Sequence, residues 1–342
     1  MALFLNNINV SPMSKYTVTL VSTLKNYLEG EGEVILPINT TQIEENCFKE
    51  TNITSITIPN TVESIGWNAF AYCYDLKSVT FEQGSKCGGI GQSTFAACKA
   101  LEEITIPASV QYVGNNCFTS CETLKSVTFE QGSQCQYFDA NCFSYCIALE
   151  EITIPASVEE IKNYAFWNCS ALTTVNFEEG SKLESITGFN SCTSLKNITL
   201  PESLISISGF QDCKSLEHIN IPSNVTYIGE TAFSGCSALK EINLPNSVTS
   251  INYRSFDSCT SLTTVTIPSL ITYIPAAFIN CSSLKEVIIP SSVESITSDA
   301  FYGCSALTDI YINKPENSIS GAPWYADNAT IHWNSTGPEE NV

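Results

Sequence analysis

The chain has few of the residues that build most catalytic sites and nucleic-acid interfaces. Only two histidines occur in 342 residues, His218 and His332, and they lie far apart in the chain. Lysine and arginine together number 15 against 35 acidic residues, so the formal net charge is -20. A surface of this charge repels phosphate groups and anionic lipids. We therefore expect no nucleic-acid partner, and a Ser-His-Asp or Cys-His arrangement would lack a suitably placed base.

Long apolar runs and phosphate-binding loops are also missing. No apolar run approaches the length of a membrane-spanning helix, so we expect no membrane insertion. Residues 1–10 lack the basic start and the apolar core of a secretion signal. The glycine-rich stretch at residues 88–91 is not followed by the Lys-Ser/Thr helix start of a phosphate loop. These absences predict a chain that is not an enzyme and that uses no cofactor.

The chain does contain a repeated Phe-x-x-Cys motif. Successive cysteines of the motif are 21 to 25 residues apart, a period in the range of leucine-rich repeats. Because a single unit cannot enclose its own apolar side chains, the units are expected to stack as a solenoid. The eleven copies begin at Phe70, Phe95, Phe118, Phe143, Phe166, Phe189, Phe210, Phe233, Phe256, Phe278 and Phe301.

Each unit reads approximately I-P-x-x-V-x-x-I-x-x-x-A-F-x-x-C-x-x-L-x-x-V-x-I. The Leu-x-x-Val-x-Ile part alternates apolar and polar residues before a proline, as a half-buried strand does. Residues 62–73 have apolar side chains three to five apart, which favours a short helical or 3₁₀ return. The predicted fold is an α/β repeat, a leucine-rich-repeat solenoid with a parallel β-sheet on one face and helical or 3₁₀ returns on the other. The returns before Phe189, Phe210 and Phe278 are shorter, and the stack should kink or narrow there.

The full pattern, as it stands in residues 154–172 and 221–239, closely resembles the BspA-like leucine-rich-repeat family. The resemblance covers about residues 34–312. It implies a surface or secreted protein of the kind found in bacteria and protozoan parasites, associated with adhesion to host proteins and extracellular matrix or with co-aggregation of cells. The family provides no catalytic residues to carry over. Since no secretion signal is recognised, a cytoplasmic or virion-associated location is the alternative to the cell surface.

Eleven of the sixteen cysteines occupy one repeat position, where a small apolar residue would line the interior. A ladder of disulfides is not expected, because parallel side chains on neighbouring strands keep the Cβ atoms about 5 Å apart, farther than a bridge prefers. Cys87 and Cys135 occupy equivalent positions two repeats apart, and the sequence leaves their exposure open.

Four cysteines could in principle form a thiolate metal site. Cys117 and Cys121 are four residues apart on one repeat, and Cys142 and Cys146 have the same spacing on the next. Structural zinc sites need tight turns that aim the sulfur atoms at one point, and this spacing provides none. Positions 117 and 142 are small residues in other repeats, so packing in the core explains them equally well, and we expect no metal.

The exposed strand positions offer a binding surface. The residue between the last two apolar strand residues is threonine or asparagine in nine successive repeats, and the row two residues earlier contains serine, glutamate, threonine, asparagine and histidine. These rows predict a polar, moderately acidic concave face suited to many weak hydrogen bonds with an extended partner. β-Branched threonine also favours strands, so stability alone is a second explanation. The predicted contact residues are Thr153, Asn176, Thr199, His218 and Asn220.

The organisation follows from these features. Residues 1–33 are predicted to be an N-terminal segment and cap, residues 34–312 a solenoid of about 12 repeats, and residues 313–342 a C-terminal cap with an acidic tail. The predicted function is a non-catalytic adhesion module that binds a protein, such as a host surface or matrix protein, through its concave face. The alternative is a rigid structural or assembly component of a virion or surface appendage, anchored by its N-terminal segment.

Overall fold

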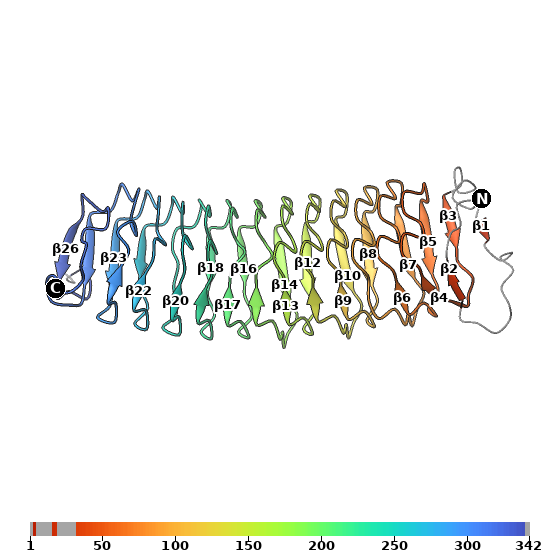
Figure 1. The fold of residues 1–342 in the computed structure, drawn as a ribbon, viewed down its shortest axis with the longest axis horizontal. Helices are drawn as coiled ribbons and strands as arrows, with labels where there is room; N and C mark the ends of the chain where they lie inside the picture. Colours follow the sequence, from red (N-terminus) through yellow and green to blue (C-terminus); the bar gives the residue numbers. More distant parts are fainter. Residues whose placement is uncertain (1–2, 5–15, 19–31, 339–342) are drawn as a thin grey trace. The chain divides into compact units, whose positions relative to one another are not determined.

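The computed structural model describes residues 3–4, 16–18 and 32–338. The chain forms two compact units, Met1–Leu183 and Glu184–Val342. Within each unit, successive repeats stack so that each strand lies beside the equivalent strand of the next repeat (Figure 1). The division falls directly before the first shortened return, which precedes Phe189. Most of the predicted acidic tail, residues 339–342, lies outside the described residues.

Nearly every repeat contributes a strand to a parallel ladder, and we call these the long strands; residues 241–243 contribute isolated bridges instead. In the first unit these strands form two sheets, β1-β3-β5-β7 and β8-β10-β12-β14; in the second they include the sheet β21-β23-β25-β26 and the pair β16-β18. Their bounds in the first unit are β1 Leu3–Phe4, β3 Glu33–Ile35, β5 Ser55–Ile58, β7 Ser78–Phe81, β8 Glu103–Ile106, β10 Ser126–Phe129, β12 Glu151–Ile154 and β14 Thr174–Phe177. In the second unit they are β16 Asn197–Thr199, β18 His218–Asn220, β21 Thr264–Thr266, β23 Glu286–Ile289, β25 Asp309–Ile312 and β26 Thr330–Trp333.

The alternation of the sequence predicts the two sides of these long strands correctly. In β8, Ile104 and Ile106 are buried while Glu103 and Thr105 are exposed. The register places equivalent residues of successive repeats opposite each other, as with Thr105 and Thr128 of β10. Because side chains of successive strand residues point to opposite faces, one face of the ladder is apolar and the other polar. We call the exposed side the long-strand face of each unit.

The predicted helical or 3₁₀ returns are wrong, because the described residues contain no helix. The return instead carries a second strand, which has two residues in most repeats and is an isolated bridge at Ile90; we call these the short strands. In the first unit these strands are β2 Tyr16–Val18, β4 Thr40–Ile43, β6 Ser64–Ile65, β9 Tyr112–Val113, β11 Tyr137–Phe138 and β13 Glu160–Ile161. In the second they are β15 Ser185–Ile186, β17 Ser206–Ile207, β19 Tyr227–Ile228, β20 Ser250–Ile251, β22 Tyr273–Ile274 and β24 Ser295–Ile296.

The Phe-x-x-Cys segment is a turn whose backbone bonds to the next repeat. The N–H groups of Asn68, Phe70 and Tyr72 donate to carbonyls one repeat further on, at 3.0, 2.8 and 2.7 Å. Asn68 and Tyr72, two residues before and two after the phenylalanine, both have positive φ. A residue with positive φ interrupts a right-handed helix. Apolar spacing alone could not reveal this, because a tight turn and a helix bury residues at similar intervals.

Phenylalanine rings form a continuous column inside each unit. In the first unit the ring centroids of consecutive phenylalanines, from Phe48 to Phe166, are 5.1 to 5.3 Å apart. In the second unit, from Phe189 to Phe301, they are 5.4 to 6.1 Å apart. Burying one such ring contributes about 1.5–3 kcal/mol. The repeats therefore stabilise one another through identical contacts, as expected for a solenoid.

Both ends of the described chain carry further strands. Near the N-terminus, β1 pairs with β3 and β2 pairs with β4, each in parallel. Near the C-terminus, β26 pairs with β25. Trp324 is fully buried there, and its indole Nε1 donates to the Ser320 carbonyl at 3.0 Å. The ladder therefore extends beyond the last Phe-x-x-Cys repeat.

Adjacent alanines test the conformation of the turn. Ala97 has a φ of 58°, whereas Ala96 is not among the positive-φ residues. Replacing Ala97 by glycine removes the left-handed penalty and should stabilise the protein by about 1 kcal/mol. The matched change Ala96→Gly should destabilise it by about 0.5–1 kcal/mol. Urea unfolding followed by circular dichroism measures both, and destabilisation by Ala97→Gly would support a helical return instead.

Candidate functional site

All five predicted contact residues are exposed on long strands. In the first unit, Thr153 of β12 lies opposite Asn176 of β14. In the second unit, Thr199 of β16 lies opposite Asn220 of β18, and His218 begins β18. The His218 imidazole Nδ1 is 3.8 Å from a carboxylate oxygen of Glu241, and both side chains are more than half exposed. The five residues thus divide between two units, two in the first and three in the second.

The first unit has a hollow in its long-strand face that the sequence did not predict. It has a volume of about 400 Å³ and is lined by side chains of β7, β8 and β10 with the following Glu130. It opens where one sheet ends at β7 and the next begins at β8. Ser78 and Ser126 flank Glu103 in the same row, and these small side chains leave space on either side of the longer glutamate. This alternation is the signal for the hollow that the sequence carries.

The hollow is polar and carries negative charge. Thr80, Thr105 and Thr128 contribute hydroxyl groups, which both donate and accept hydrogen bonds. Glu103 is exposed, and the Glu130 carboxylate accepts a hydrogen bond from the Ala108 backbone N–H at 3.0 Å. The lining residues include no lysine or arginine. The hollow therefore favours a partner that brings positive charge and hydrogen-bond donors.

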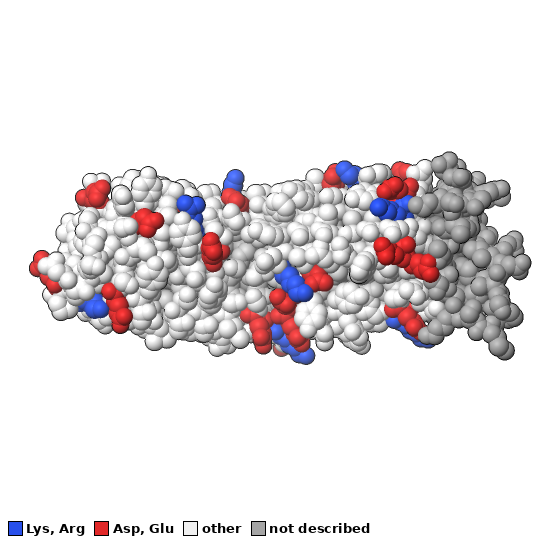
Figure 2. Space-filling view, viewed as in Figure 1, with Lys and Arg blue, Asp and Glu red and all other residues white. Residues whose placement is uncertain are grey.

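Two lysines near the long strands pair with glutamates of neighbouring repeats. The Lys125 ammonium is 2.8 Å from Glu102, and the Lys240 ammonium is 2.7 Å from Glu217. The hydrogen bond between partners raises the pKa of Lys125 and lowers that of Glu102. On the side seen in Figure 2, blue groups accordingly lie close to red ones, and most of the surface carries no charge. Exposed pairs of this kind contribute little to stability. They neutralise these two lysines, and the remaining acidic side chains determine the sign of the surface charge.

Aromatic side chains also lie outside the core, on the Phe-x-x-Cys turns. In the first unit, Trp167 stands 4.9 Å from Tyr145 and 5.7 Å from Tyr164 between ring centroids, and all three are at least 36% exposed. Tyr145 and Tyr164 have positive φ, which is unfavourable for bulky residues. Trp67 is 59% exposed on another turn. These rings are accessible, but they lie on the turns and not on the long-strand face.

All sixteen cysteines are buried. The motif thiol donates a hydrogen bond to the phenylalanine carbonyl of the preceding repeat, as in Cys73 to Phe48 at 2.9 Å and Cys236 to Phe210 at 3.1 Å. Valine or alanine would fill similar space but could not donate this bond. The recurrence of cysteine thus follows from the need for a small buried side chain that is also a donor.

Burial makes these thiols poor nucleophiles. Cys87 and Cys135, whose exposure the sequence left open, are both fully buried. Burial raises the pKa of Cys87 to about 11 and that of Cys135 to about 12, from an ordinary value of 9.0. It also raises the pKa of Cys117 and Cys142. Within the described ranges, no three side chains of histidine, cysteine, aspartate or glutamate lie close enough to hold a metal ion.

The fold and the stacked motif define a parallel β-solenoid of leucine-rich repeats. Residues 41–173, 131–209 and 205–329 match the family described as the BspA type leucine rich repeat region, in six copies. The chain therefore belongs to the BspA-type leucine-rich-repeat family. A comparison with curated proteins found no match. The described residues include no helix with the length and apolar character needed to span a membrane.

Solved bacterial structures show the same fold. A leucine-rich repeat protein from Bacteroides ovatus is 27% identical with a TM-score of 0.60, and the match covers 88% of this chain and 92% of that one. A leucine rich cell surface protein from Faecalibacterium prausnitzii is 26% identical with a TM-score of 0.50, covering 84% and 89%. The pneumococcal vaccine antigen PcpA is 22% identical with a TM-score of 0.58, covering 93% and 91%, and it supports the fold alone.

The buried thiols predict a loss of stability at alkaline pH. In the unfolded chain a thiol ionises near pH 9, whereas folded Cys87 and Cys135 keep their protons to about pH 11 and 12. Above pH 9 the folded state binds more protons, so the free energy of unfolding falls by up to about 1.4 kcal/mol per pH unit for each such thiol. Urea unfolding at pH 8, 9 and 10 under reducing conditions should show this decline.

A matched variant isolates the contribution of the thiols. The position equivalent to Cys87 and Cys135 is occupied by Leu183, which is also fully buried. The double change Cys87→Leu and Cys135→Leu should therefore fold and should show a shallower decline above pH 9. Equal slopes for the variant and the original protein would contradict the assignment of the pH dependence to these groups.

Proposed function

We propose that this protein is a non-catalytic adhesion module that binds a protein partner through its long-strand face. The observation that carries the proposal is the exposed ladder of threonine, asparagine and glutamate side chains over a close-packed core. A rigid polar surface makes many hydrogen bonds without the cost of ordering mobile side chains. Membership of the BspA-type family supports the same class of function.

The hollow over β7, β8 and β10 is the proposed centre of contact in the first unit. Its three threonine hydroxyls suit the backbone of an extended segment, and Glu103 suits a lysine or arginine side chain. Electrostatic attraction between the acidic protein and a basic segment would also speed their association. The contact would continue along the same face to Thr153 and Asn176.

The second unit would present its own long-strand contacts. Thr199, Asn220 and His218 are exposed on adjacent strands β16 and β18. Their hydroxyl, amide and imidazole groups provide both donors and acceptors. We propose these three residues as the contact set of this unit. Variants of each unit can be tested separately.

The proposed setting is a cell surface, and the proposed partner is a host surface or matrix protein. The similarity to the cell surface protein of Faecalibacterium prausnitzii supports this setting. An acidic, hydrogen-bonding surface is compatible with matrix proteins that display basic segments. A catalytic role has no support from the two histidines, since His218 is exposed beside Glu241 and His332 contacts Asp309.

Surface plasmon resonance against a panel of purified extracellular-matrix proteins tests the proposal. The double change Thr105→Lys and Thr128→Lys places two positive charges in the hollow. It should weaken binding of the captured matrix protein at least about tenfold, through charge repulsion and crowding. The matched control is Gln111→Lys with Gln136→Lys, two exposed positions beside the short strands, which should leave the affinity unchanged. Equal affinity of all three proteins would overturn the hollow as the centre of contact.

A second pair tests the contacts of the other unit. Thr199→Lys with Asn220→Lys alters β16 and β18 without touching the hollow. We expect a loss of affinity of at least about threefold if both units bind the same partner, and circular dichroism should show unchanged folding. If only this pair weakens binding, the contact centre belongs to the second unit and not to the hollow.

A further inference from the structure

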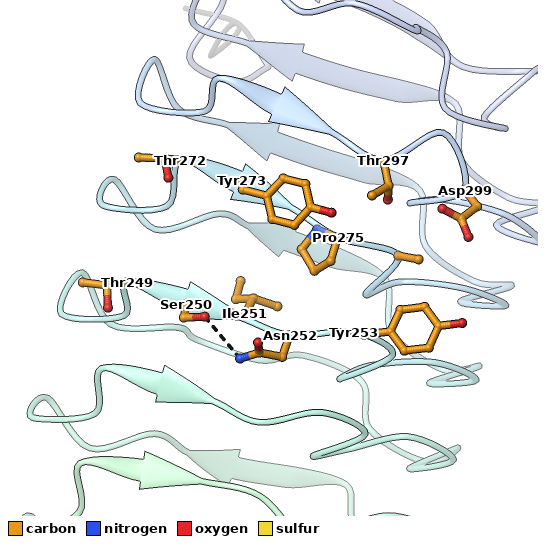
Figure 3. A pocket seen from close by; sticks show the side chains of 11 residues that line it. Thr249, Ser250, Ile251, Asn252, Tyr253, Thr272, Tyr273, Pro275, Thr297 and Asp299 are labelled. Atoms are coloured by element: carbon orange, nitrogen blue, oxygen red, sulfur yellow. Dashed lines mark hydrogen bonds between the residues drawn. The ribbon is translucent and has the colours of Figure 1, made fainter.

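The second unit contains a groove on a different side from its long strands. The groove has a volume of about 470 Å³ and crosses three successive repeats. One repeat contributes residues 249–253, the next contributes Thr272, Tyr273, Pro275 and Ala276, and the third contributes Thr297 and Asp299. Figure 3 shows the ring of Pro275 between the side chains of the flanking repeats. The groove lies beside the short strands β20, β22 and β24.

A missing residue explains the groove. Four residue steps separate Ile274 from Phe278, whereas five separate Ile251 from Phe256 and Ile296 from Phe301. The shorter return cannot extend outward as far as its neighbours, and Pro275 and Ala276 become the floor between them. The Arg254 N–H donates to the Ala276 carbonyl at 3.0 Å, and the Ala277 N–H donates to the Pro275 carbonyl at 2.7 Å. These backbone bonds hold the recess in place.

The lining combines flat aromatic surface with uncharged polar groups. Tyr253 and Tyr273 are 45% and 49% exposed. The Asn252 amide nitrogen donates to the Ile228 carbonyl at 2.7 Å and to the Ser250 hydroxyl at 3.2 Å, which orients its carbonyl oxygen. Asp299 is the only charged residue among those that line the groove. The site therefore offers aromatic faces, hydroxyls, one amide and one carboxylate.

We propose that this groove binds a neutral saccharide. The C–H face of a sugar ring is apolar and packs on an aromatic face such as that of Tyr273, while its hydroxyls can bond to Asn252 and Asp299. A volume of this size lies within the range of small-ligand sites and accommodates one or two sugar rings. The net charge of the protein and the Asp299 carboxylate disfavour an acidic sugar or a phosphate.

Two alternative explanations are less consistent with the lining. A protonated amine would pair with Asp299, but Figure 3 shows the rings of Tyr253 and Tyr273 well apart and not enclosing one point. The guanidinium of Arg254 already lies over the Tyr253 ring, 5.3 Å from its centroid, and so occupies one face of it. An apolar peptide side chain would leave the polar groups of the groove without partners, which is unfavourable. A saccharide would contact both the aromatic faces and the polar groups of the groove.

Saturation-transfer NMR on the full chain tests the proposal with four neutral disaccharides: maltose, cellobiose, lactose and N,N′-diacetylchitobiose. At least one should receive saturation, with a dissociation constant in the millimolar range or below. Tyr273→Ser should weaken its binding at least about tenfold. Tyr227→Ser is the matched control, because Tyr227 is 44% exposed at the same position of strand β19 and does not line the groove.

Several outcomes would overturn the proposal. Absence of saturation transfer to all four sugars excludes a neutral saccharide site, and so does a signal that Tyr273→Ser and Tyr227→Ser reduce equally. Binding of choline or of lysine methyl ester in place of the sugars would identify a cation site instead. The groove is separate from the long-strand face, so Thr105→Lys with Thr128→Lys should leave sugar binding unchanged.

Discussion

Backbone hydrogen bonding from one repeat to the next is the constraint on which the rest of the structure depends. In the turns, alternate N–H groups reach the following repeat, and left-handed residues such as Asn68 and Tyr72 turn the chain so that they can do so. Each phenylalanine carbonyl faces the interior, where it must find donors because an unpaired buried acceptor is costly. The thiol of the next repeat provides one. Cysteine at this position combines a hydrogen-bond donor with a small side chain.

This regular interior leaves the outer surfaces free to vary. On the long strands, buried isoleucine and valine alternate with exposed residues that have no packing role, so a ladder of hydroxyls, amides and carboxylates can form there. Two hollows interrupt these outer surfaces. One opens at the junction of β7 and β8, and the other lies above the shortened return at Pro275. A break between two sheets and a shortened return thus each accompany a concave site.

The repeat, the parallel ladder and the inward face of each strand follow from the sequence, since periods of 2 and of about 23 residues are visible in it. The conformation of the returns could not be predicted correctly. Apolar spacing around Phe70 cannot distinguish hydrogen bonds within a repeat from hydrogen bonds between repeats. The exposed positions of Thr153 and Asn220 were predicted, but the hollow at Glu103 was not, since it depends on how two sheets meet. The groove at Pro275 could not be predicted either, because it depends on how far the neighbouring returns extend outward.

The central claim is that the long-strand face, and not the turns or the short strands, contacts a protein partner. Site-specific photo-cross-linking tests it most directly. A photoreactive residue would replace Thr128 on the long-strand face or Gln136 beside the short strand β11, and each protein would be irradiated with its captured matrix partner. The account predicts cross-links from position 128 and none from position 136. Cross-links from position 136 with none from position 128 would contradict it.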